Sequence, residues 1–505
     1  MQLKFRLPVP GIGACKWSII IGLLVLGCAV SAAMIPNLFP FLDPAGIVST
    51  YNVNGPIDET NAFFQSLGTN GRSCATCHIA GNAFGLSAQH AQSRFRATRG
   101  RDPLFAAVDG ANCPTVSPGD PEGHSLLLKN GLIRVGLQMR ANAQFTIRAV
   151  HDPYGCASVT DPVTGQQTIS VYRRPLPTSN LRFLSTVMFD GRETIQPLNN
   201  AQTFQANLVT DLMHQAMDAT LGHAQAANPP TTEQQTAIVN FELGLFSAQV
   251  LDRRAGLLFA HGAQGGPLNL SQQSYYPGIN DSLGHDPQGA AFNPAVFSIF
   301  EAWANRAGHD SDGEDSAELR QRIAAGETLF NTHPLTISNV RGLNDNSALG
   351  TSLPIAPFQG TCTTCHNTPN VGNHSFPLPL DIGTGHDAAN EPDTQIASGI
   401  SELSFPDLPV FEITGCPNPF PDPQQPNAPF VIFTTDPGKA LISGQCSDVN
   451  RIKGPILRGL AARAPYFHNG AARNLNEVVN FYNQRFQMNL TDKEKSQLVA
   501  FLNSL

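Results

Sequence analysis

Two copies of the pattern Cys-x-x-Cys-His constrain this chain more than any other feature of its sequence. The first copy spans residues 74–78 and the second spans residues 362–366. Two thiols three positions apart on one helical turn can each add to a vinyl group on the same edge of a porphyrin, and the adjacent histidine then lies under the ring as an iron ligand. The sequence therefore predicts two covalently bound haem c groups. Their attachment sites are Cys74, Cys77, Cys362 and Cys365, and their proximal iron ligands are His78 and His366.

A bare Cys-x-x-Cys pair also occurs in redox dithiols and as half of a zinc site. Zinc would need two further soft ligands beside each pair, and redox pairs rarely end in histidine. Because the full five-residue pattern occurs twice, we interpret both copies as haem attachment sites.

The length of the chain predicts more than one hydrophobic core. Single cores rarely grow beyond about 250–300 residues, and this chain has 505. With one haem motif in each half, we expect a first domain at residues 34–312 and a second at residues 313–505. The acidic run at 310–315 between them lacks the EF-hand layout and is interpreted as a solvated linker. The net charge of −8 gives no basic patch, so no nucleic-acid partner is expected.

The N-terminal segment, residues 1–33, has the layout of a secretory signal. Lys4, Arg6 and Lys16 precede an apolar run over residues 17–35, which has small residues at 31–33. We therefore expect an exported, periplasmic protein. The run is also long enough to span a bilayer if it is not cleaved, so anchoring to the inner membrane through this segment stays an alternative, as does a lipid anchor at Cys28.

Four cysteines lie outside both the haem motifs and the N-terminal segment. They are Cys113, Cys156, Cys416 and Cys446. An even number of cysteines in an exported protein indicates disulfides. Proximity in the sequence favours one bridge between the first two and one between the last two, and free buried thiols are the alternative.

Helical spacing and abundant loop-forming residues predict a mainly α fold with long loop insertions. Apolar periodicity indicates helices at residues 58–67, 203–220, 232–250 and 318–330. Residues 81–177 are rich in Gly, Pro, Asp and Asn, with one strand-like stretch at 168–172.

The C-terminus predicts two further helices. Asn474 with Glu477 makes one capping pair, and Thr491 with Glu494 makes another, each followed by an apolar stripe. We expect these two helices to close the second haem pocket.

Four short segments resemble signatures of a known family. They are Phe-Asp-Gly-Arg at 189–192, GPILRG at 454–459, APYFHNG at 464–470 and VVNFY at 478–482. Together with the two haem motifs, they closely resemble the bacterial dihaem cytochrome c peroxidase and MauG family. The resemblance implies two cytochrome c-like domains, here with large insertions, in which the first haem reacts with peroxide and the second receives or stores electrons.

The resemblance also implies roles for residues of the second half. Tyr482 lies fourteen residues after His468, where peroxidases of the family place an axial Met and MauG-type members an axial Tyr. We therefore predict Tyr482 as an iron ligand of the second haem. Met488 is the second candidate for this ligand, and the alternative role for Tyr482 is that of an ordinary aromatic residue of the core. His468 is expected to form hydrogen bonds beside this haem. Pro465 would lend its carbonyl to one calcium ion between the haems.

Two positions depart from the family pattern. Phe189 stands where peroxidases of the family carry a Trp, and Gln225 stands where they carry a distal Glu. A distal acid or base must move a proton as the O–O bond breaks, and we assign this catalytic role to His223. His214 is a second candidate, and Glu193 is expected to be structural. His90 and Met139 are further candidates for the first iron.

These observations predict a peroxide-dependent dihaem oxidoreductase. Hydrogen peroxide would be the substrate, and a small redox protein such as a cytochrome c would donate electrons. Two other functions stay open: a non-enzymatic electron carrier in the periplasm, or an oxidase or oxygenase of a macromolecular substrate.

Overall fold

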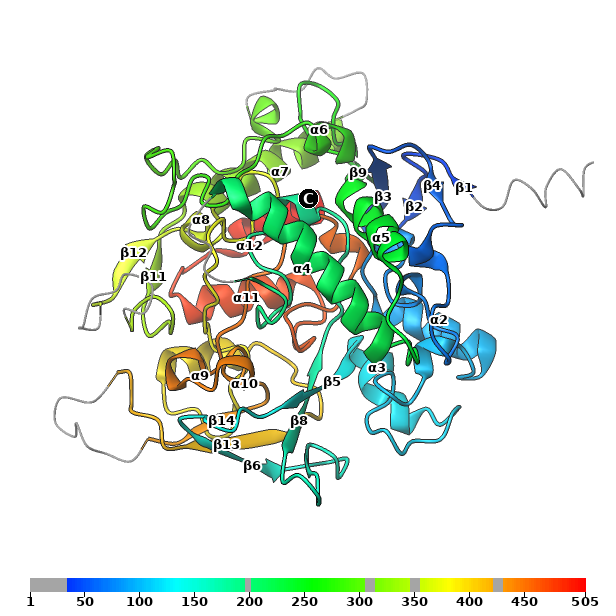
Figure 1. Cartoon of the computed structure of the whole chain (residues 1–505). Coiled ribbons are helices and arrows are strands. Elements are labelled where there is room, and N and C mark those ends of the chain that lie inside the picture. The colour runs from blue at the N-terminus through cyan, green and yellow to red at the C-terminus, as the bar shows by residue number, and fades with distance from the viewer. Residues whose placement is uncertain (1–33, 196–200, 305–313, 346–354, 421–429) are drawn as a thin grey trace, which may run out of the picture.

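The computed structural model describes residues 34–195, 201–304, 314–345, 355–420 and 430–505 (Figure 1). The predicted signal or anchor segment at residues 1–33 lies outside this part of the chain, and so does most of the acidic run. Within the described ranges, no helix is long and apolar enough to cross a membrane.

Helices and strands alternate along the chain. The helices are α2 (Ala88–Thr98), α3 (Ser125–Asn130), α4 (Ala201–Gly222), α5 (Thr232–Gly244), α6 (Pro267–Ser271), α7 (Glu314–Thr332), α8 (Cys362–Cys365), α9 (Thr394–Ile400), α10 (Ala440–Ser443), α11 (Leu475–Arg485) and α12 (Asp492–Asn503). The strands are β1 (Met34–Ile35), β2 (Phe41–Leu42), β3 (Gly46–Asn52), β4 (Ile57–Asp58), β5 (Ile133–Gln138), β6 (Thr146–His151), β7 (Ser158–Thr160), β8 (Gln167–Arg173), β9 (Leu245–Asp252), β10 (Gly256–Leu257), β11 (Leu335–Ile337), β12 (Phe358–Gly360), β13 (Val410–Thr414) and β14 (Ile432–Thr434).

The prediction of a mainly α fold is wrong. Helices make up 31% of the structure, and strands in several small sheets make up 16%. The largest error lies in residues 81–177, where β5, β7 and β8 form a three-stranded antiparallel sheet. Only β8 carries a recognisable run of β-branched and aromatic residues. Strand β5 alternates apolar Ile133, Val135 and Leu137 with other residues, a period-two pattern that the loop prediction overlooked. Strand β7 has only three residues, too few for a local pattern, and forms by pairing with β8.

Two predicted helices are shorter than expected. The helix expected at 232–250 ends at Gly244, and the chain continues as β9, which pairs with β3. The Thr50 and Ser247 hydroxyls lie 2.7 Å apart across this pair. The helix expected at 58–67 is a single 3₁₀ turn, Ala62–Phe64.

The other helical predictions are confirmed. Helices α4 and α7 cover the expected ranges. At α11, the Asn474 side chain accepts a hydrogen bond from the Glu477 backbone N–H at 3.0 Å. At α12, Thr491 and Glu494 cap each other reciprocally.

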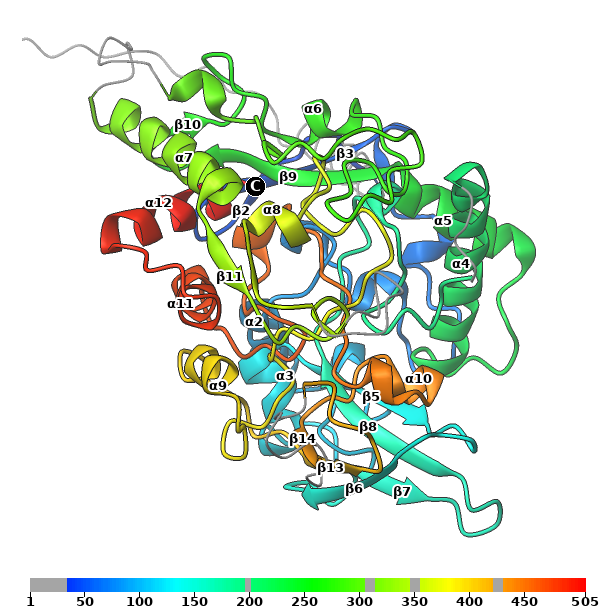
Figure 2. The ribbon, with the colours of Figure 1, turned by 90° about the vertical axis from the view of Figure 1, so that its left-hand side faces the viewer.

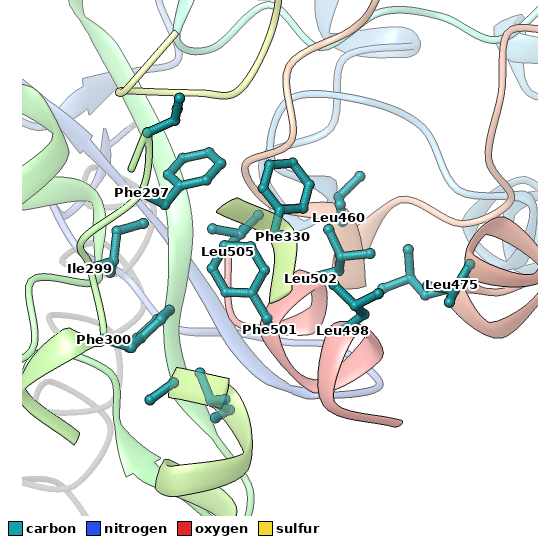
Figure 3. Packing of buried hydrophobic residues seen from close by; sticks show 14 of the residues in the cluster. Phe297, Ile299, Phe300, Phe330, Leu460, Leu475, Leu498, Phe501, Leu502 and Leu505 are labelled. Atoms are coloured by element: carbon teal, nitrogen blue, oxygen red, sulfur yellow. The ribbon is translucent and has the colours of Figure 1, made fainter. Parts of the chain in front are cut away.

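The largest core cluster packs α7, α11 and α12 against the segment around Phe297 (Figure 3). Phe297, Phe300, Phe330 and Phe501 meet there with ring centroids 5.5–6.3 Å apart. Burying four aromatic rings together supplies much of the apolar area that holds the second half of the chain.

One sheet joins segments that are far apart in the sequence. Strand β13 pairs with β14 on one side and with β6 on the other, so the first half of the chain contributes an edge to a sheet of the second half. This sheet lies at the bottom of Figure 1, and the β10-β9-β3-β2 sheet lies at the opposite end (Figures 1 and 2).

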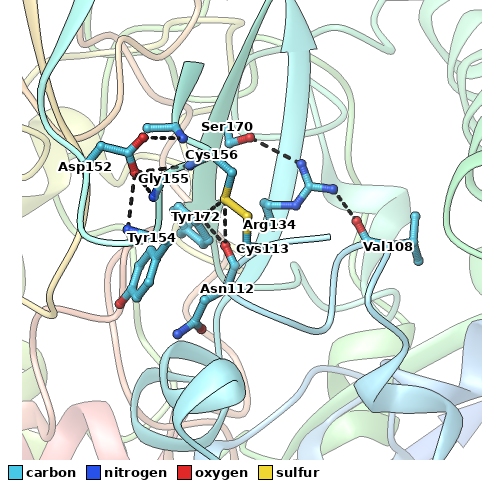
Figure 4. Close-up of a disulfide and its surroundings, with 11 residues drawn as sticks. Val108, Asn112, Cys113, Arg134, Asp152, Tyr154, Gly155, Cys156, Ser170 and Tyr172 are labelled. Carbon is cyan, nitrogen blue, oxygen red and sulfur yellow. Dashed lines mark hydrogen bonds between the residues drawn. A yellow bond between two sulfur atoms is a disulfide. The ribbon is translucent and has the colours of Figure 1, made fainter. Parts of the chain in front are cut away.

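Two disulfides join the four remaining cysteines in the pairs that sequence proximity favours, Cys113–Cys156 and Cys416–Cys446. The first bridge fastens the loop before α3 to the β5–β8 sheet (Figure 4). There the Tyr172 hydroxyl donates to the carbonyl oxygen of Asn112 at 2.5 Å.

Candidate haem centres

Both Cys-x-x-Cys-His motifs adopt the same capped turn. The first is a 3₁₀ turn, Cys74–Thr76, and the second is the single-turn helix α8. In each, a residue before the first cysteine donates its backbone N–H to the threonine hydroxyl three positions on, at 3.0 Å for Ser73 and for Thr361. The four motif cysteines are free thiols, whereas the other four described cysteines are paired. The turns therefore present both thiols for covalent attachment.

The two motif histidines are oriented alike. Nδ1 of His78 lies 3.2 Å from the carbonyl oxygen of Phe84, and Nδ1 of His366 lies 2.6 Å from that of Gly372. A carbonyl can only accept, so Nδ1–H donates and Nε2 keeps its lone pair. Burial lowers the pKa of His78 to about 4 and also lowers the pKa of His366. Both rings are therefore neutral at pH 7, the form that binds iron.

Each motif opens into a large cavity. The first encloses about 1480 Å³, counted together with its opening to solvent, and is lined by Cys74, Cys77 and His78. The second encloses about 1780 Å³, counted in the same way, and is lined by Cys362, Cys365 and His366, with residues of α11 and α12 along its far side. The two C-terminal helices thus line the second cavity as expected.

The two cavities share one wall. Six residues line both of them, namely Arg174, Pro175, Leu176, Pro177, Phe189 and Lys453. The wall is tied together by the Lys453 backbone N–H, which donates to the carbonyl oxygen of Phe189 at 2.8 Å. The two sites are therefore neighbours rather than independent pockets.

The chemistry of this wall fits a pair of haems. Arg174 and Lys453 are buried, and neither forms an ion pair with a carboxylate of the described chain. Burial lowers the pKa of Lys453 to about 8. Buried cations without counter-ions are costly, whereas haem c carries two anionic propionates. Propionates at this wall would supply the missing negative charge.

The first cavity contains a hydrogen-bonded acid–base pair. His223, just after α4, has its Nδ1 against the carboxylate of Asp109, which also forms a buried ion pair with Arg72. Although burial opposes it, hydrogen bonding and charge from His223 and Arg72 lower the pKa of Asp109. All three side chains line the cavity together with Gln215. Asp109 thus fixes the orientation of the His223 imidazole at the cavity.

Sequence reasoning missed Glu242, which also lines the first cavity. Its side chain is 2% exposed, its Oε2 atom has no hydrogen-bond partner among the described residues, and burial raises its pKa to about 8. The missed signal is its position on α5, where it shares an inward stripe with Ile238 and Val239, four and three residues before it. A carboxylic acid is therefore present at this cavity although Gln225 replaces the expected one.

Several other candidates lie away from the first cavity. His214 is more than half exposed and bonds Glu193 at 2.6 Å. Gln225 accepts a hydrogen bond from Asn70 at 3.3 Å. His214 and Gln225 do not line the first cavity, and neither do the other two candidate ligands, His90 and Met139. Met139 instead packs against the β6–β13 core.

The second cavity contains several groups able to reach an iron or its surroundings. Tyr482, Met488, His374 and His468 all line it. The Tyr482 ring centroid lies 6.4 Å from that of His366, and burial raises the pKa of Tyr482. His374 was not singled out from the sequence, and its Nε2 lies 3.4 Å from Oδ1 of Asp281 without forming a hydrogen bond of good geometry.

A buried charge network connects the second cavity with the Phe-Asp-Gly-Arg segment. Arg173 bonds Asp436 at 2.6 and 2.9 Å and Asp190 at 2.5 Å. His468 lies 3.7 Å from Asp436, too long for a hydrogen bond, and burial lowers its pKa to about 4. The Phe189 ring is 6.2 Å from that of His468. Phe189 therefore belongs both to the shared wall and to the surroundings of His468.

Known proteins with similar sequences are cytochrome-c peroxidases. The IdrP2 protein of Denitromonas iodatirespirans is 29% identical over 154 residues, which are 29% of this chain and 36% of that protein. IdrP2 of Pseudomonas sp. (strain SCT) is 30% identical over 229 residues, 42% of this chain and 53% of that protein. IdrP1 of the same strain is 27% identical over 177 residues, 32% of this chain and 41% of that protein.

The chain is similar to cytochrome-c peroxidases. The matched part spans between 36% and 53% of the length of these relatives. No protein-family model matches the chain.

Proposed function

We propose that this chain is a dihaem c-type cytochrome that reduces hydrogen peroxide with electrons from a small redox protein such as a cytochrome c. The observation that carries this proposal is the pair of cavities that share one wall, each beginning at a Cys-x-x-Cys-His turn. The relatives that bear the name cytochrome-c peroxidase support haem c as the cofactor and peroxide as the substrate.

The two sites are unequal in this proposal. The second cavity contains Tyr482 across from His366, and phenolate ligation would stabilise ferric iron and suit storage of an oxidising equivalent. The first cavity instead contains the Asp109–His223 pair and Glu242, which are proton-transfer groups. Peroxide would therefore react at the first haem, while the second holds or passes electrons, as the MauG-like resemblance implies.

Side chains would have four roles around the cofactors: iron ligation, proton transfer, orientation of the proton-carrying histidine, and pairing with propionates. When bound, haem iron provides the redox chemistry that cleaves peroxide. Nε2 of His78 and of His366 would each hold an iron. His223 would carry a proton on Nε2 while Asp109 fixes its ring, and Lys453 would pair with propionates on the shared wall.

Electrons would pass between the sites across the wall that contains Phe189. Its benzene ring is not readily oxidised, so this position would shorten the path by packing rather than act as a redox station. Calcium is not part of this proposal, because the carbonyl oxygen of Arg463, two residues before Pro465, already accepts a hydrogen bond from the Arg174 guanidinium.

We further propose that residues 34–312 and 313–505 are two cytochrome c-like units with insertions, and that residues 1–33 direct export to the periplasm. The two disulfides agree with an oxidising compartment. N-terminal sequencing of the mature protein tests this export signal. If residues 1–33 are still present, the segment is retained as a membrane anchor instead.

The decisive experiment titrates purified holoprotein with hydrogen peroxide in the presence of a reduced cytochrome. We expect a high-spin ferric signal by electron paramagnetic resonance, and oxidation of the donor that depends on peroxide. If both irons are low-spin and the donor is not oxidised, the protein is an electron carrier and the peroxidase proposal fails.

A pair of histidine variants tests the proton-transfer role. His223→Ala should lower the turnover number by about 10²–10⁴ with both haems still attached. His214→Ala is the matched control, because His214 lies on α4, the helix that His223 directly follows, but outside the cavity. Equal activity of the two variants would remove His223 from the mechanism.

A further inference from the structure

Arg174 is a buried cation bonded only to backbone carbonyl groups. Its Nη2 donates to the carbonyl oxygens of Leu86 and, at 2.7 Å, of Arg463. Its Nη1 donates to that of Asn130 at 3.2 Å and lies 3.5 Å from that of Gly131. No carboxylate of the described chain forms an ion pair with it. Four carbonyl dipoles therefore surround the positive charge.

The cage is shaped for this side chain. A Cβ atom on Gly131 would lie 1.9 Å from Nη1 of Arg174, and Gly131 has a φ of +63°, which favours glycine. Burial and the neighbouring Arg463 lower the pKa of Arg174 to about 9. The guanidinium is therefore still protonated at pH 7.

The cage lies where the two haem cavities meet. Arg174 lines both of them, and its backbone N–H donates to the carbonyl oxygen of His468 at 2.7 Å. The Arg463 carbonyl belongs to the segment that leads into Pro465. This is the segment from which the family resemblance implies a calcium ligand between the haems.

A calcium ion does not fit this cage. Calcium binds six to eight oxygen ligands, usually including carboxylates. The carbonyl oxygens here already accept hydrogen bonds from Arg174, and the adjacent charged group is a second cation, Arg463. We propose that the Arg174 guanidinium is a built-in cation between the two haems, which takes the place of a calcium ion and makes this chain independent of calcium.

The proposal has an electrostatic consequence for both cofactors. A fixed positive charge stabilises the reduced, less positive state of a nearby iron. Because Arg174 lines both cavities, its charge should raise the reduction potentials of both haems together. A purely structural side chain would not have this effect.

The first test measures calcium in the wild-type holoprotein. After dialysis, elemental analysis should find well under one calcium per chain. Addition of a chelator or of calcium chloride should leave the thermal unfolding midpoint and the spectra of both haems unchanged. One retained calcium per chain, whose removal alters the spectra, would overturn the proposal.

The second test removes the charge and restores it. Arg174→Ala should lower the midpoint potentials of both haems and the unfolding temperature, and added guanidinium chloride at millimolar concentration should partly restore both. Arg174→Lys should keep the potentials near those of the wild type. Arg148→Ala is the control, because Arg148 is a 70% exposed arginine paired with Glu412.

Unchanged potentials in Arg174→Ala would contradict the proposal. If that variant does not accumulate with haem, Gly131→Ala replaces it, because the added methyl group displaces Nη1 without deleting the charge. It should then destabilise the protein while both midpoint potentials stay close to the wild-type values, and a clear fall in both potentials with the charge retained would contradict the proposal. None of these measurements requires peroxide turnover, so failure here leaves the proposed function standing.

Discussion

Nδ1 of His366 lies 2.6 Å from the carbonyl oxygen of Gly372, and this contact decides which imidazole nitrogen is free. The carbonyl oxygen accepts a hydrogen bond from Nδ1–H, so Nε2 is the nitrogen that keeps its lone pair. His78 and Phe84 repeat the relationship at the first cavity at 3.2 Å. Second-shell bonds of this kind also make the imidazole more basic toward a metal.

Replacing Tyr482 by Phe should change the spectrum of the second haem only. The variant removes the proposed oxygen ligand and keeps the ring that stacks on Phe486 at 5.8 Å. Visible and paramagnetic resonance spectra of the oxidised holoprotein measure the change. Tyr466→Phe is the control, because Tyr466 lines the same cavity but donates its hydroxyl to the Leu460 carbonyl. An unaltered spectrum in Tyr482→Phe would exclude ligation.

Glu242 should make the protein less stable as the pH rises. Burial raises its pKa from 4.5 to about 8, so the folded state holds a proton that the unfolded state releases between these values. Over that window the wild type should lose about 1.4 kcal/mol per pH unit from this group. The free energy of unfolding of Glu242→Gln should depend less on pH, and this variant should be more stable than the wild type at pH 8. Urea unfolding at pH 5, 6.5 and 8 measures this, and parallel curves would contradict the assignment.

Gly326 should not tolerate alanine, although it lies inside helix α7. A Cβ atom there would lie 2.0 Å from the carbonyl oxygen of Gln497 on α12. We expect Gly326→Ala to destabilise the protein by about 1–3 kcal/mol because the two helices must move apart. Gly222→Ala is the matched control, since nothing lies within 4 Å of its added methyl group. Gly222→Ala should be neutral or stabilising, and equal unfolding midpoints for the two variants would refute the argument.

His386 should stabilise the protein at neutral pH and lose this effect in alkali. Although burial opposes it, Asp381, 2.8 Å away, and Glu391 raise the pKa of His386 to about 10. The contribution is complete below the usual value of 6.5 and is lost as the pH rises toward 10. His386→Leu should cost about 3–5 kcal/mol at pH 6, because it leaves buried carboxylates unpaired, and less at pH 10.

His151→Leu is the control for this prediction, since it removes an exposed histidine 3.2 Å from Asp407. Its effect on the urea midpoint should be within about 0.5 kcal/mol at both pH values. If His386→Leu has the same small effect at both pH values, charge pairing of His386 with Asp381 and Glu391 does not stabilise the protein.

Helices with strong caps and regular apolar stripes were predictable because their determinants lie within one or two turns. The Asn474 and Thr491 caps are of this kind. Strands were not, because β9 depends on β3, some two hundred residues earlier in the chain. The helical stripe of α5 therefore ran into β9 in the prediction without any local signal to stop it.

The residues of the candidate site also fall into two groups: those that a local motif predicts and those that only the tertiary structure brings to the site. The attachment of a haem and the position of its proximal ligand depend on five neighbouring residues, so the motif from Cys74 to His78 is enough to predict both. His223 could be nominated by its position, but Asp109, which orients it, lies 114 residues away. Glu242 went unnoticed because one acid on a helix is common, and only the cavity shows that it is buried without a partner.

The sequence by itself predicted the two haem attachment motifs, their candidate histidine ligands and the helices near the C-terminus, since attachment and capping chemistry act over a few residues. Only the tertiary structure decided that the two cavities share a wall, that Phe189 and Lys453 belong to it, and that Arg174 is enclosed by carbonyl groups from three separate segments. Such arrangements arise from packing between distant parts of the chain, which no local spacing encodes.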